Sequence, residues 1–233
     1  MTAFVPARSG SKRLVGKNIK LLAGKPLVFW TLEPLMLSKK VDRVIFSTDS
    51  LDYWEIVKTH FDSNKLTLDY RLPEEAGDNV KIFDYIVTKR EKIFKSSDEV
   101  FILTLPTVPF RTLKHIDEAY ELYCMTQSPI FSATEYGFPI SFAFTVNRGG
   151  RWTPMYDASP LVTGNTRSQD QQVVYHPNGA IYIREIADLA DKNLKTLYMG
   201  ASPYLMDRTA SIDIDNETDF VIASAIAEAG LAG

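Results

Sequence analysis

Residues 2–18 read TAFVPARSGSKRLVGKN, and this stretch decides the fold class. Residues 2–6 are mostly apolar, as in a short strand buried inside a sheet. Residues 7–18 carry four basic side chains and two glycines, which is typical of a loop. Because open α/β sheets bind ligands beyond the carboxyl ends of their strands, the stretch predicts an α/β fold with a phosphate-binding loop after its first strand.

The chemistry of this loop suits a triphosphate. Gly10 and Ser11 are small enough for backbone N–H groups to approach phosphate oxygens. Arg8, Lys12 and Lys17 can neutralise charge that develops on a triphosphate during transfer. Neither the GxxxxGK[ST] pattern of P-loop proteins nor the GxGxxG pattern of dinucleotide-binding folds is present. From these residues alone, a phosphate loop and a solvated basic turn both stay open.

Helix-like segments alternate with short apolar runs in the first half of the chain, which is the pattern of successive βαβ units. Such units build a mostly parallel sheet with helices on both faces. We expect strands at residues 2–6, 41–47, 66–70 and 100–105. We expect helices at residues 26–38, 51–60, 80–94 and 113–125, the last with Thr112 as its N-cap.

The second half of the chain has a different pattern from about residue 133. Short aromatic-rich segments are broken there by turn residues, such as NRGG at residues 147–150. The pattern predicts a small antiparallel lobe at about residues 133–166, inserted into a single domain of residues 1–233. A buried strand follows at 179–183, and SIDID at residues 211–215 precedes a final helix at about 218–229.

Composition and charge limit the partners of the chain. With 26 basic and 29 acidic side chains and a formal net charge of -3, bulk electrostatics would not hold nucleic acid or an anionic membrane. Arg8 interrupts the first apolar run too early for a signal peptide, and nothing approaches about eighteen uninterrupted apolar residues. We expect a soluble, cytoplasmic protein without nucleic-acid or membrane partners. The single Cys124 is expected to be a buried structural thiol.

Two carboxylates near the end of the chain are candidate metal ligands. Asp213 and Asp215 alternate with apolar residues, so on an extended segment both side chains point to one face. A pair of carboxylate oxygens suits Mg²⁺, which is a hard cation with oxygen ligands. The alternative is an acidic pair that caps the following helix.

A polar segment near residue 167 is a candidate sugar-acid site. The guanidinium of Arg167 can clamp a carboxylate through two hydrogen bonds, and Gln169 can bond sugar hydroxyls. The alternative is a surface ion pair between Arg167 and Asp170. For His176, proton transfer and a structural hydrogen bond both stay open.

Several motifs resemble one family in a consistent order. PARSGSKR at residues 6–13, continued by KNI and LAGKPL, closely resembles the opening of bacterial acylneuraminate (CMP-sialic acid) cytidylyltransferases. Later segments resemble the same family: VIFSTDS at 44–50, PTVPFRT at 106–112, PNGAIYI at 177–183, and SIDID. The likeness runs from about residue 2 to residue 220.

The resemblance implies a reaction and an assembly. CTP and a nine-carbon 2-keto sugar acid give the CMP-sugar and pyrophosphate, with Mg²⁺ as cofactor. The implied fold is a Rossmann-like sheet with a lobe that exchanges across a homodimer.

Residue roles follow by matched position. The resemblance places Arg8, Ser11, Lys12 and Lys17 at the triphosphate, with Asn18 beside the triphosphate or the cytidine. Ala7 and Arg71 would lie by the base and ribose. Arg8, Lys17 and Asp215 would be catalytic, and Asp213 and Asp215 would bind the metal. The residues implied at the sugar are Leu105, Arg167, Gln169 and Tyr182.

Three departures from the family pattern bear on the substrates. Leu105 stands where common sialate enzymes carry glutamine, and Ser141 stands where a basic residue often follows a proline. Residues 78–82 read DNVKI in place of DTASS, which leaves backbone groups or Lys81 to recognise cytosine.

An apolar wall formed by Leu105 and Val108 favours a less polar sugar. We therefore expect a 5,7-diamino-trideoxy nonulosonate, of the pseudaminic or legionaminic type, rather than N-acetylneuraminate. Two further alternatives stay open. One is a 3-deoxy-octulosonate cytidylyltransferase, whose opening motif is similar, and the other is a catalytically inactive nucleotide-binding module.

Overall fold

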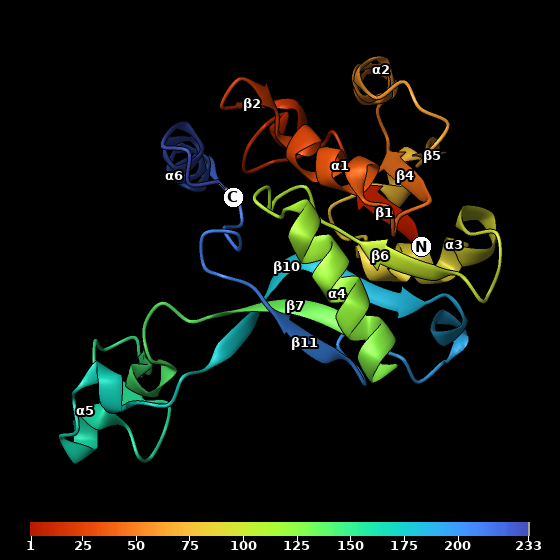
Figure 1. The fold of residues 1–233 in the computed structure, drawn as a ribbon. Coiled ribbons are helices and arrows are strands. Elements are labelled where there is room, and N and C mark those ends of the chain that lie inside the picture. The colour runs from red at the N-terminus through yellow and green to blue at the C-terminus, as the bar shows by residue number, and fades with distance from the viewer. Residues whose placement is uncertain (233) are drawn as a thin grey trace.

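A seven-stranded sheet forms the centre of the molecule, as the computed structural model of residues 1–232 shows (Figure 1). The strands follow one another in the order β11-β7-β10-β6-β1-β4-β5. They are β1 (Thr2–Pro6), β4 (Arg43–Thr48), β5 (Leu66–Tyr70), β6 (Val100–Leu103), β7 (Ile130–Glu135), β10 (Tyr175–Glu185) and β11 (Ser202–Leu205). Four neighbouring pairs are parallel, and β10 runs antiparallel to both β6 and β7. The predicted α/β class with a mostly parallel sheet is confirmed.

Helices cover both faces of this sheet, because successive strand residues point to opposite sides. In β1, Ala3 and Val5 join the core beneath α1 (Leu27–Leu37), α2 (Leu51–His60) and α4 (Leu113–Thr126). Phe4, between them, packs on the opposite side with residues of α3 (Ile82–Ile93). The last helix, α6 (Glu217–Glu228), packs on the segment that follows the basic loop. The helix bounds lie within two residues of the predicted ones.

Side-chain caps fix the starts of three of the longer helices. Ser50 accepts a hydrogen bond from a backbone N–H at the start of α2, and Thr112 does so at the start of α4, as predicted. The cap of α6 is Asn216, whose Oδ1 accepts from the N–H of Asp219 at 3.1 Å. Neither Asp213 nor Asp215 therefore caps this helix.

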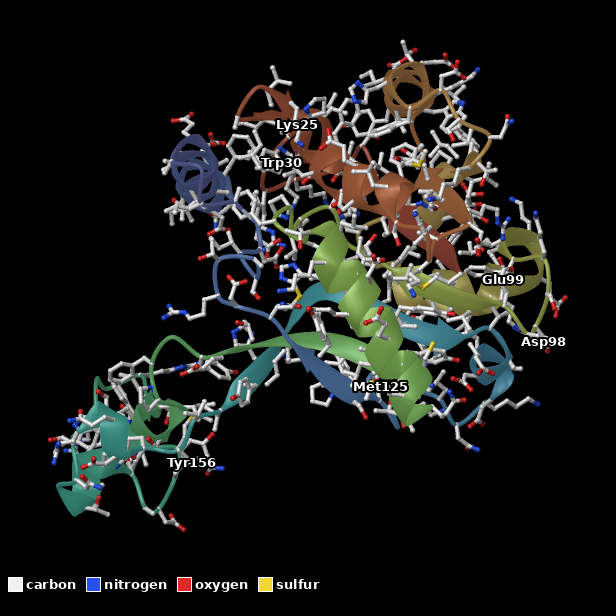
Figure 2. The ribbon with its side chains drawn as sticks, in the orientation of Figure 1. Lys25, Trp30, Asp98, Glu99, Met125 and Tyr156 are labelled. Atoms are coloured by element: carbon white, nitrogen blue, oxygen red, sulfur yellow. The ribbon has the colours of Figure 1, made fainter. Side chains whose placement is uncertain are left out.

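The other regular elements are short. A hairpin of β2 (Leu21–Leu22) and β3 (Lys25–Pro26) follows the basic loop, and the Lys25 ammonium lies 4.0 Å from the centre of the Trp30 ring (Figure 2). The 3-10 helices are η1 (Lys17–Ile19), η2 (Pro73–Glu75), η3 (Ile140–Phe142), η4 (Ser168–Asp170) and η5 (Ala187–Ala190).

Between β7 and β10 the chain leaves the sheet and forms a projecting lobe, drawn in green and teal at the lower left of Figure 1. It contains the antiparallel pair β8 (Phe144–Val146) and β9 (Trp152–Pro154), and the short helix α5 (Pro160–Thr163). The lobe spans residues 136–174, and not about 133–166, because β7 continues to Glu135 and pairs there with Tyr175 of β10. Large apolar side chains are exposed on it: Phe138, Phe144, Val146, Trp152, Met155, Tyr156, Leu161 and Val162.

The prediction for Cys124 was wrong, because this thiol is exposed. The fully buried residues of α4 are Ile116 and Ala119, and the last turn of the helix lies beyond them and carries the exposed Met125 (Figure 2). Within the described part of the chain, no helix combines the length and the apolar character needed to cross a membrane.

Candidate active site

A cleft of about 460 Å³ opens at the carboxyl ends of the parallel strands. Its walls come from the basic loop after β1, from Arg71 after β5 and from the turn after β6. The structure thus brings together most of the residues predicted at the nucleotide. The lining residues are Pro6, Arg8, Ser11, Lys12, Arg13, Lys17, Asn18, Arg71, Asp78, Val80, Ile82, Leu105, Pro106 and Thr107.

The basic loop has a fixed shape. Asp49 accepts hydrogen bonds from the backbone N–H of Ser9 at 2.7 Å and from its hydroxyl at 3.0 Å. The buried Asn18 donates its amide to the carbonyl of Arg8 at 2.9 Å, so it shapes the loop beneath the cleft. Gly16 has φ +64°, in the left-handed region that favours glycine. Asp49 was not predicted to have this role, because its partner lies 40 residues away.

Of the two residues predicted beside the base and ribose, Arg71 lines the cleft and Ala7 does not. Ala7 is fully buried and its N–H donates to the carbonyl of Ser47 at 2.8 Å, so its side chain does not reach the cleft. The guanidinium of Arg71 donates to the same carbonyl at 3.2 Å. Burial lowers the pKa of Arg71, and the nearby carboxylate of Asp49 opposes this shift.

Lys17 is a buried cation that faces the acidic segment. Its ammonium donates to the carbonyl of Ile214 at 2.6 Å and lies 3.6 Å from Asp215. Burial lowers its pKa, while the charges of Asp215 and Asp213 oppose the shift. Only about a tenth of the side chain is exposed, so Lys17 is held in one position beside the cleft.

The two predicted metal ligands flank a fully buried residue. Ile214 donates its N–H to the carbonyl of Thr107 at 2.8 Å, and this bond joins the acidic segment to the turn after β6. Asp213 and Asp215 lie on either side of Ile214 and keep access to solvent. Desolvation by the surrounding protein raises the pKa of Asp213, and the charge of Asp215 adds to this effect.

The acidic pair fits a magnesium ion that completes its ligands from phosphates. No group of three or more histidine, cysteine, aspartate or glutamate side chains in residues 1–232 could hold a metal alone. Magnesium is usually held by one or two protein carboxylates together with waters and substrate phosphates. Asp213 and Asp215 supply two such carboxylates, and Asp215 lies beside Lys17.

Three ion pairs of the cations that line the cleft were not predicted. Arg13 forms two hydrogen bonds of 3.0 Å each with the carboxylate of Asp215. Asp78 contacts two cations, with Arg8 at 2.9 Å and Lys12 at 2.5 Å. Both carboxylates join segments far apart in the chain, which local sequence patterns do not reveal.

A buried arginine shapes the turn after β6. Arg111 donates to the carbonyls of Val108 and Leu105, at 2.9 and 3.3 Å, and to the hydroxyl of Thr31 at 3.1 Å. Burial lowers its pKa to about 9. The turn that it holds presents Leu105 to the cleft.

A second pocket of about 270 Å³ adjoins the cleft and shares Ile82 and Leu105 with it. Tyr182 lines this pocket, and its hydroxyl lies 2.9 Å from that of Tyr198. Burial raises the pKa of Tyr182, so its phenol stays protonated at neutral pH. Lys81, predicted at the nucleotide, lines this second pocket instead of the cleft.

The predicted wall residue Val108 does not line either pocket. Its side chain is fully buried in the core beneath α1 and α4. Gly179 lies next to it and has φ +75°, and a Cβ added there would lie 3.4 Å from Leu105 and 3.9 Å from Val108. Of the two predicted wall residues, Leu105 lines the cleft and Val108 does not.

Arg167 and Gln169 lie in the projecting lobe, and the single chain does not bring them to the cleft. The guanidinium of Arg167 lies 3.7 Å from the carboxylate of Asp170. When the side-chain amide of Gln169 is oriented so that its oxygen faces Arg167, that oxygen also accepts hydrogen bonds from the guanidinium. Gln169 lines a separate cavity at the base of the lobe, and Ser141 donates to Gln171 within the lobe.

The histidine at the base of the lobe has structural contacts. The ring of His176 packs against that of Tyr136, with 4.6 Å between centroids. Its Nδ1 lies 3.0 Å from the carbonyl of Pro177. These contacts agree with the structural alternative for His176.

A buried polar network joins the acidic segment to the sheet. Asn178 donates to the hydroxyl of Ser211 at 2.8 Å and accepts from that of Ser132 at 2.5 Å. Its Oδ1 also accepts from the N–H of Ala180 at 3.1 Å. The network lies where the pairing of β10 with β7 shifts register, between Pro177 and Tyr182. The PNGA motif was the only signal of it in the sequence.

An open, mostly parallel sheet with a cationic cleft at its carboxyl edge defines the class of α/β proteins that bind phosphorylated ligands at this edge. The sequence profile named Cytidylyltransferase matches residues 2–213. The chain belongs to this family of cytidylyltransferases, which confirms the relationship inferred from the motifs.

Two relatives show the range of this similarity. The N-acylneuraminate cytidylyltransferase of Escherichia coli O18:K1:H7 is 34% identical over 231 residues, which cover 96% of this chain and 51% of that protein. The CMP-N,N'-diacetyllegionaminic acid synthase of Legionella pneumophila is 28% identical over 234 residues, which cover 97% and 95%. The chain spans about half the length of the first of these relatives and nearly all of the second.

A solved structure has the same fold. The structure of a CMP:2-keto-3-deoxy-manno-octonic acid synthetase complexed with CTP superposes on this chain with a TM-score of 0.70. The superposition covers 99% of each of the two chains. The sequences are 16% identical, so this likeness concerns the fold.

Proposed function

We propose that this chain is a nucleotidyltransferase that couples CTP to a nonulosonic acid and releases the CMP-sugar and pyrophosphate. The observation that carries the proposal is the cleft itself. Four basic side chains of the loop line the cleft, two of them, Arg13 and Lys17, contact Asp215, and a second pocket shares a wall with the cleft. The names of the two relatives above and the family profile support the same reaction class.

Charge and position supply most of the catalysis in phosphoryl transfer. Arg8, Lys12 and Lys17 hold the triphosphate and neutralise its oxygens. Lys17 does this from a fixed place, because the carbonyl of Ile214 and the carboxylate of Asp215 hold its ammonium. A cation fixed before the reaction needs no reorganisation as charge develops.

Asp213 and Asp215 would hold Mg²⁺, which would neutralise charge on the phosphate oxygens and align them. The chain prepares these carboxylates in two ways. Thr107 fixes the backbone between them, and Arg13 with Lys17 holds Asp215 in place.

The second pocket receives the body of the sugar, with its 2-hydroxyl directed toward the cleft. Leu105 and Leu197 offer apolar contacts, and the hydroxyls of Tyr182 and Tyr198 offer hydrogen bonds. A pocket of this kind accepts N-acyl groups and lacks the amide that would bond an extra hydroxyl. It therefore favours a 5,7-diamino nonulosonate, pseudaminic or legionaminic, over N-acetylneuraminate.

The lobe supports a homodimer. Its exposed apolar side chains form the kind of surface that proteins usually cover with a partner. In such a dimer, Arg167 and Gln169 would serve the sugar site of the neighbouring subunit, since neither lines the cleft of its own chain and the lobe projects away from the sheet (Figure 1). Analytical ultracentrifugation tests this assembly, and a monomer at micromolar concentration would contradict it.

A substrate panel tests the proposed reaction. The purified chain is incubated with Mg²⁺, one of four nucleoside triphosphates, and N-acetylneuraminate, a legionaminate, a pseudaminate or 3-deoxy-octulosonate. We expect pyrophosphate release with CTP and a diamino nonulosonate. A rise in melting temperature with CTP but no pyrophosphate from any pair would identify a binding module instead.

The kinetic constants decide among the sugars. A higher kcat/KM with N-acetylneuraminate than with either diamino sugar would contradict the preference assigned to Leu105. Substitution of Leu105 by glutamine supplies the matching variant, and we expect it to shift the ratio of kcat/KM values toward N-acetylneuraminate by about tenfold.

A further inference from the structure

Asp78 occupies the place in the cleft where an anion would lie. One carboxylate oxygen is 2.9 Å from the guanidinium of Arg8, and the other is 2.5 Å from the ammonium of Lys12. Each oxygen thus contacts one of the two cations that we assign to the triphosphate. The lysine is mostly exposed and the arginine and Asp78 are each about one third exposed, so a ligand can reach all three.

The other two cations of the loop pair with a different carboxylate. Arg13 and Lys17 contact Asp215, and no other carboxylate in residues 1–232 lies within 4 Å of Arg8 or Lys12. Asp78 is therefore the carboxylate with which phosphate oxygens would compete for these two cations.

The segment that carries Asp78 is fastened on both sides. Glu75 accepts from the N–H of Leu72 at 2.9 Å and forms an ion pair with Lys89 of α3 at 2.6 Å. On the other side, Val80 donates to the carbonyl of Gly77 at 3.1 Å before α3 begins. A carboxylate on a short anchored turn acts at high effective concentration, so it can pair again as soon as the site is free.

We propose that Asp78 is an internal competitor of the phosphates, which CTP displaces and which returns to Arg8 and Lys12 when pyrophosphate leaves. This inference rests on the proposed function, because pyrophosphate is the product of that reaction. Asp78 thereby weakens the binding of pyrophosphate and favours its release. The hydrogen bond with Lys12 and the charge of Arg8 lower the pKa of Asp78, so the competitor stays ionised at neutral pH.

The expected size of the effect follows from the exposure of these pairs. Solvent-exposed ion pairs contribute little each, so removal of two of them should tighten pyrophosphate binding by roughly threefold to tenfold. Competition of this size is too weak to prevent CTP from binding.

The test compares two variants that each remove one negative charge from the same segment. Asp78→Asn removes the competitor and keeps its shape, while Glu74→Gln changes an exposed carboxylate that forms no ion pair in residues 1–232. Isothermal titration of the free chain with inorganic pyrophosphate, in buffer without divalent metal, gives the Kd. We expect a threefold to tenfold lower Kd for Asp78→Asn and no change for Glu74→Gln.

Two results would overturn the inference. Equal affinity in the two variants would show that Asp78 does not compete, and weaker binding in Asp78→Asn would show that it orients the cations for the ligand. Asp78→Ser must give the same direction as Asp78→Asn, which excludes a local rearrangement as the cause. Because the titration needs no turnover, a chain that shows the expected Kd values but forms no CMP-sugar contradicts only the proposed function.

Discussion

Replacement of Lys17 by methionine separates the structural role of this residue from its role in binding. Methionine keeps the unbranched stem but removes the ammonium, so the carbonyl of Ile214 loses its hydrogen-bond donor and Asp215 loses one cation. Lys12→Met is the matched control, because its side chain is 81% exposed while that of Lys17 is 10% exposed.

The magnitude follows from these contacts. A buried acceptor left without a donor costs about 1–3 kcal/mol. Part of this is offset, because a buried ammonium no longer has to be desolvated, and burial is the main cause of the lowered pKa of Lys17. We expect a loss of about 1–2 kcal/mol in the free energy of unfolding for Lys17→Met, and about 0.5 kcal/mol or less for Lys12→Met.

Urea denaturation and steady-state kinetics provide the two measurements. Both variants should bind CTP more weakly, because each loses a phosphate cation, and Lys17→Met should lower kcat/KM by about 10²-fold. If Lys17→Met were as stable as Lys12→Met, the bond to Ile214 would not contribute to folding, and the account of a fixed cation would be refuted.

Two other predictions concern the acidic segment and its support. The raised pKa of Asp213 means that its neutral form is favoured in the folded state. The stability of the wild type relative to Asp213→Asn should therefore fall as the pH rises from the unfolded pKa near 3.8 to the folded pKa, and then stay constant. Urea denaturation between pH 4 and 8 in metal-free buffer checks this, and a relative stability that rises with pH would contradict it. Asn178→Ala should lower the free energy of unfolding by about 2–3 kcal/mol, because it leaves the buried N–H of Ala180 without its acceptor and removes one hydrogen bond from each of the hydroxyls of Ser132 and Ser211. The exposed Asn193→Ala is the control, and equal stability of the two variants would show that the network is dispensable.

Local patterns in the sequence were sufficient for most of the fold. The strands at residues 2–6 and 66–70 and the helix at 51–60 were predicted with the bounds that the structure has. Thr112 caps its helix as expected. These features depend on neighbours a few residues apart, where apolar spacing and capping chemistry are visible in the chain.

The contacts that complete the cleft depend on residues far apart in the chain. Arg13 and Asp215 are separated by 202 positions, and Asp78 reaches Arg8 and Lys12 from the segment after β5. The pairing of Asp78 with Arg8 and Lys12 follows from the strand order, which places the ends of β1 and β5 along one edge of the sheet. Side-chain types alone do not contain this order.

Two predictions failed because the sequence does not show which way a residue faces. Val108 lies one residue from the cleft-lining Thr107, yet its side chain points into the core. Cys124 lies in a helix whose middle is buried and whose last turn is not. Arg167 and Gln169 were assigned to the sugar from their chemistry, and their distance from the cleft of the same chain became visible only with the projecting lobe.

The register shift in β10 has a consequence for the way this protein tolerates change. On one side of the shift, Tyr175 and Pro177 pair with β7 at the base of the lobe, and on the other side Tyr182 and Ile183 pair with it in the core. Side chains of Asn178 and Ser132 bridge the interval between the two stretches of pairing. An insertion or deletion within the lobe can therefore change the pairing near Tyr175 and leave the pairing of Tyr182 in place. An insertion or deletion between Asn178 and Tyr182 would instead displace the wall of the second pocket.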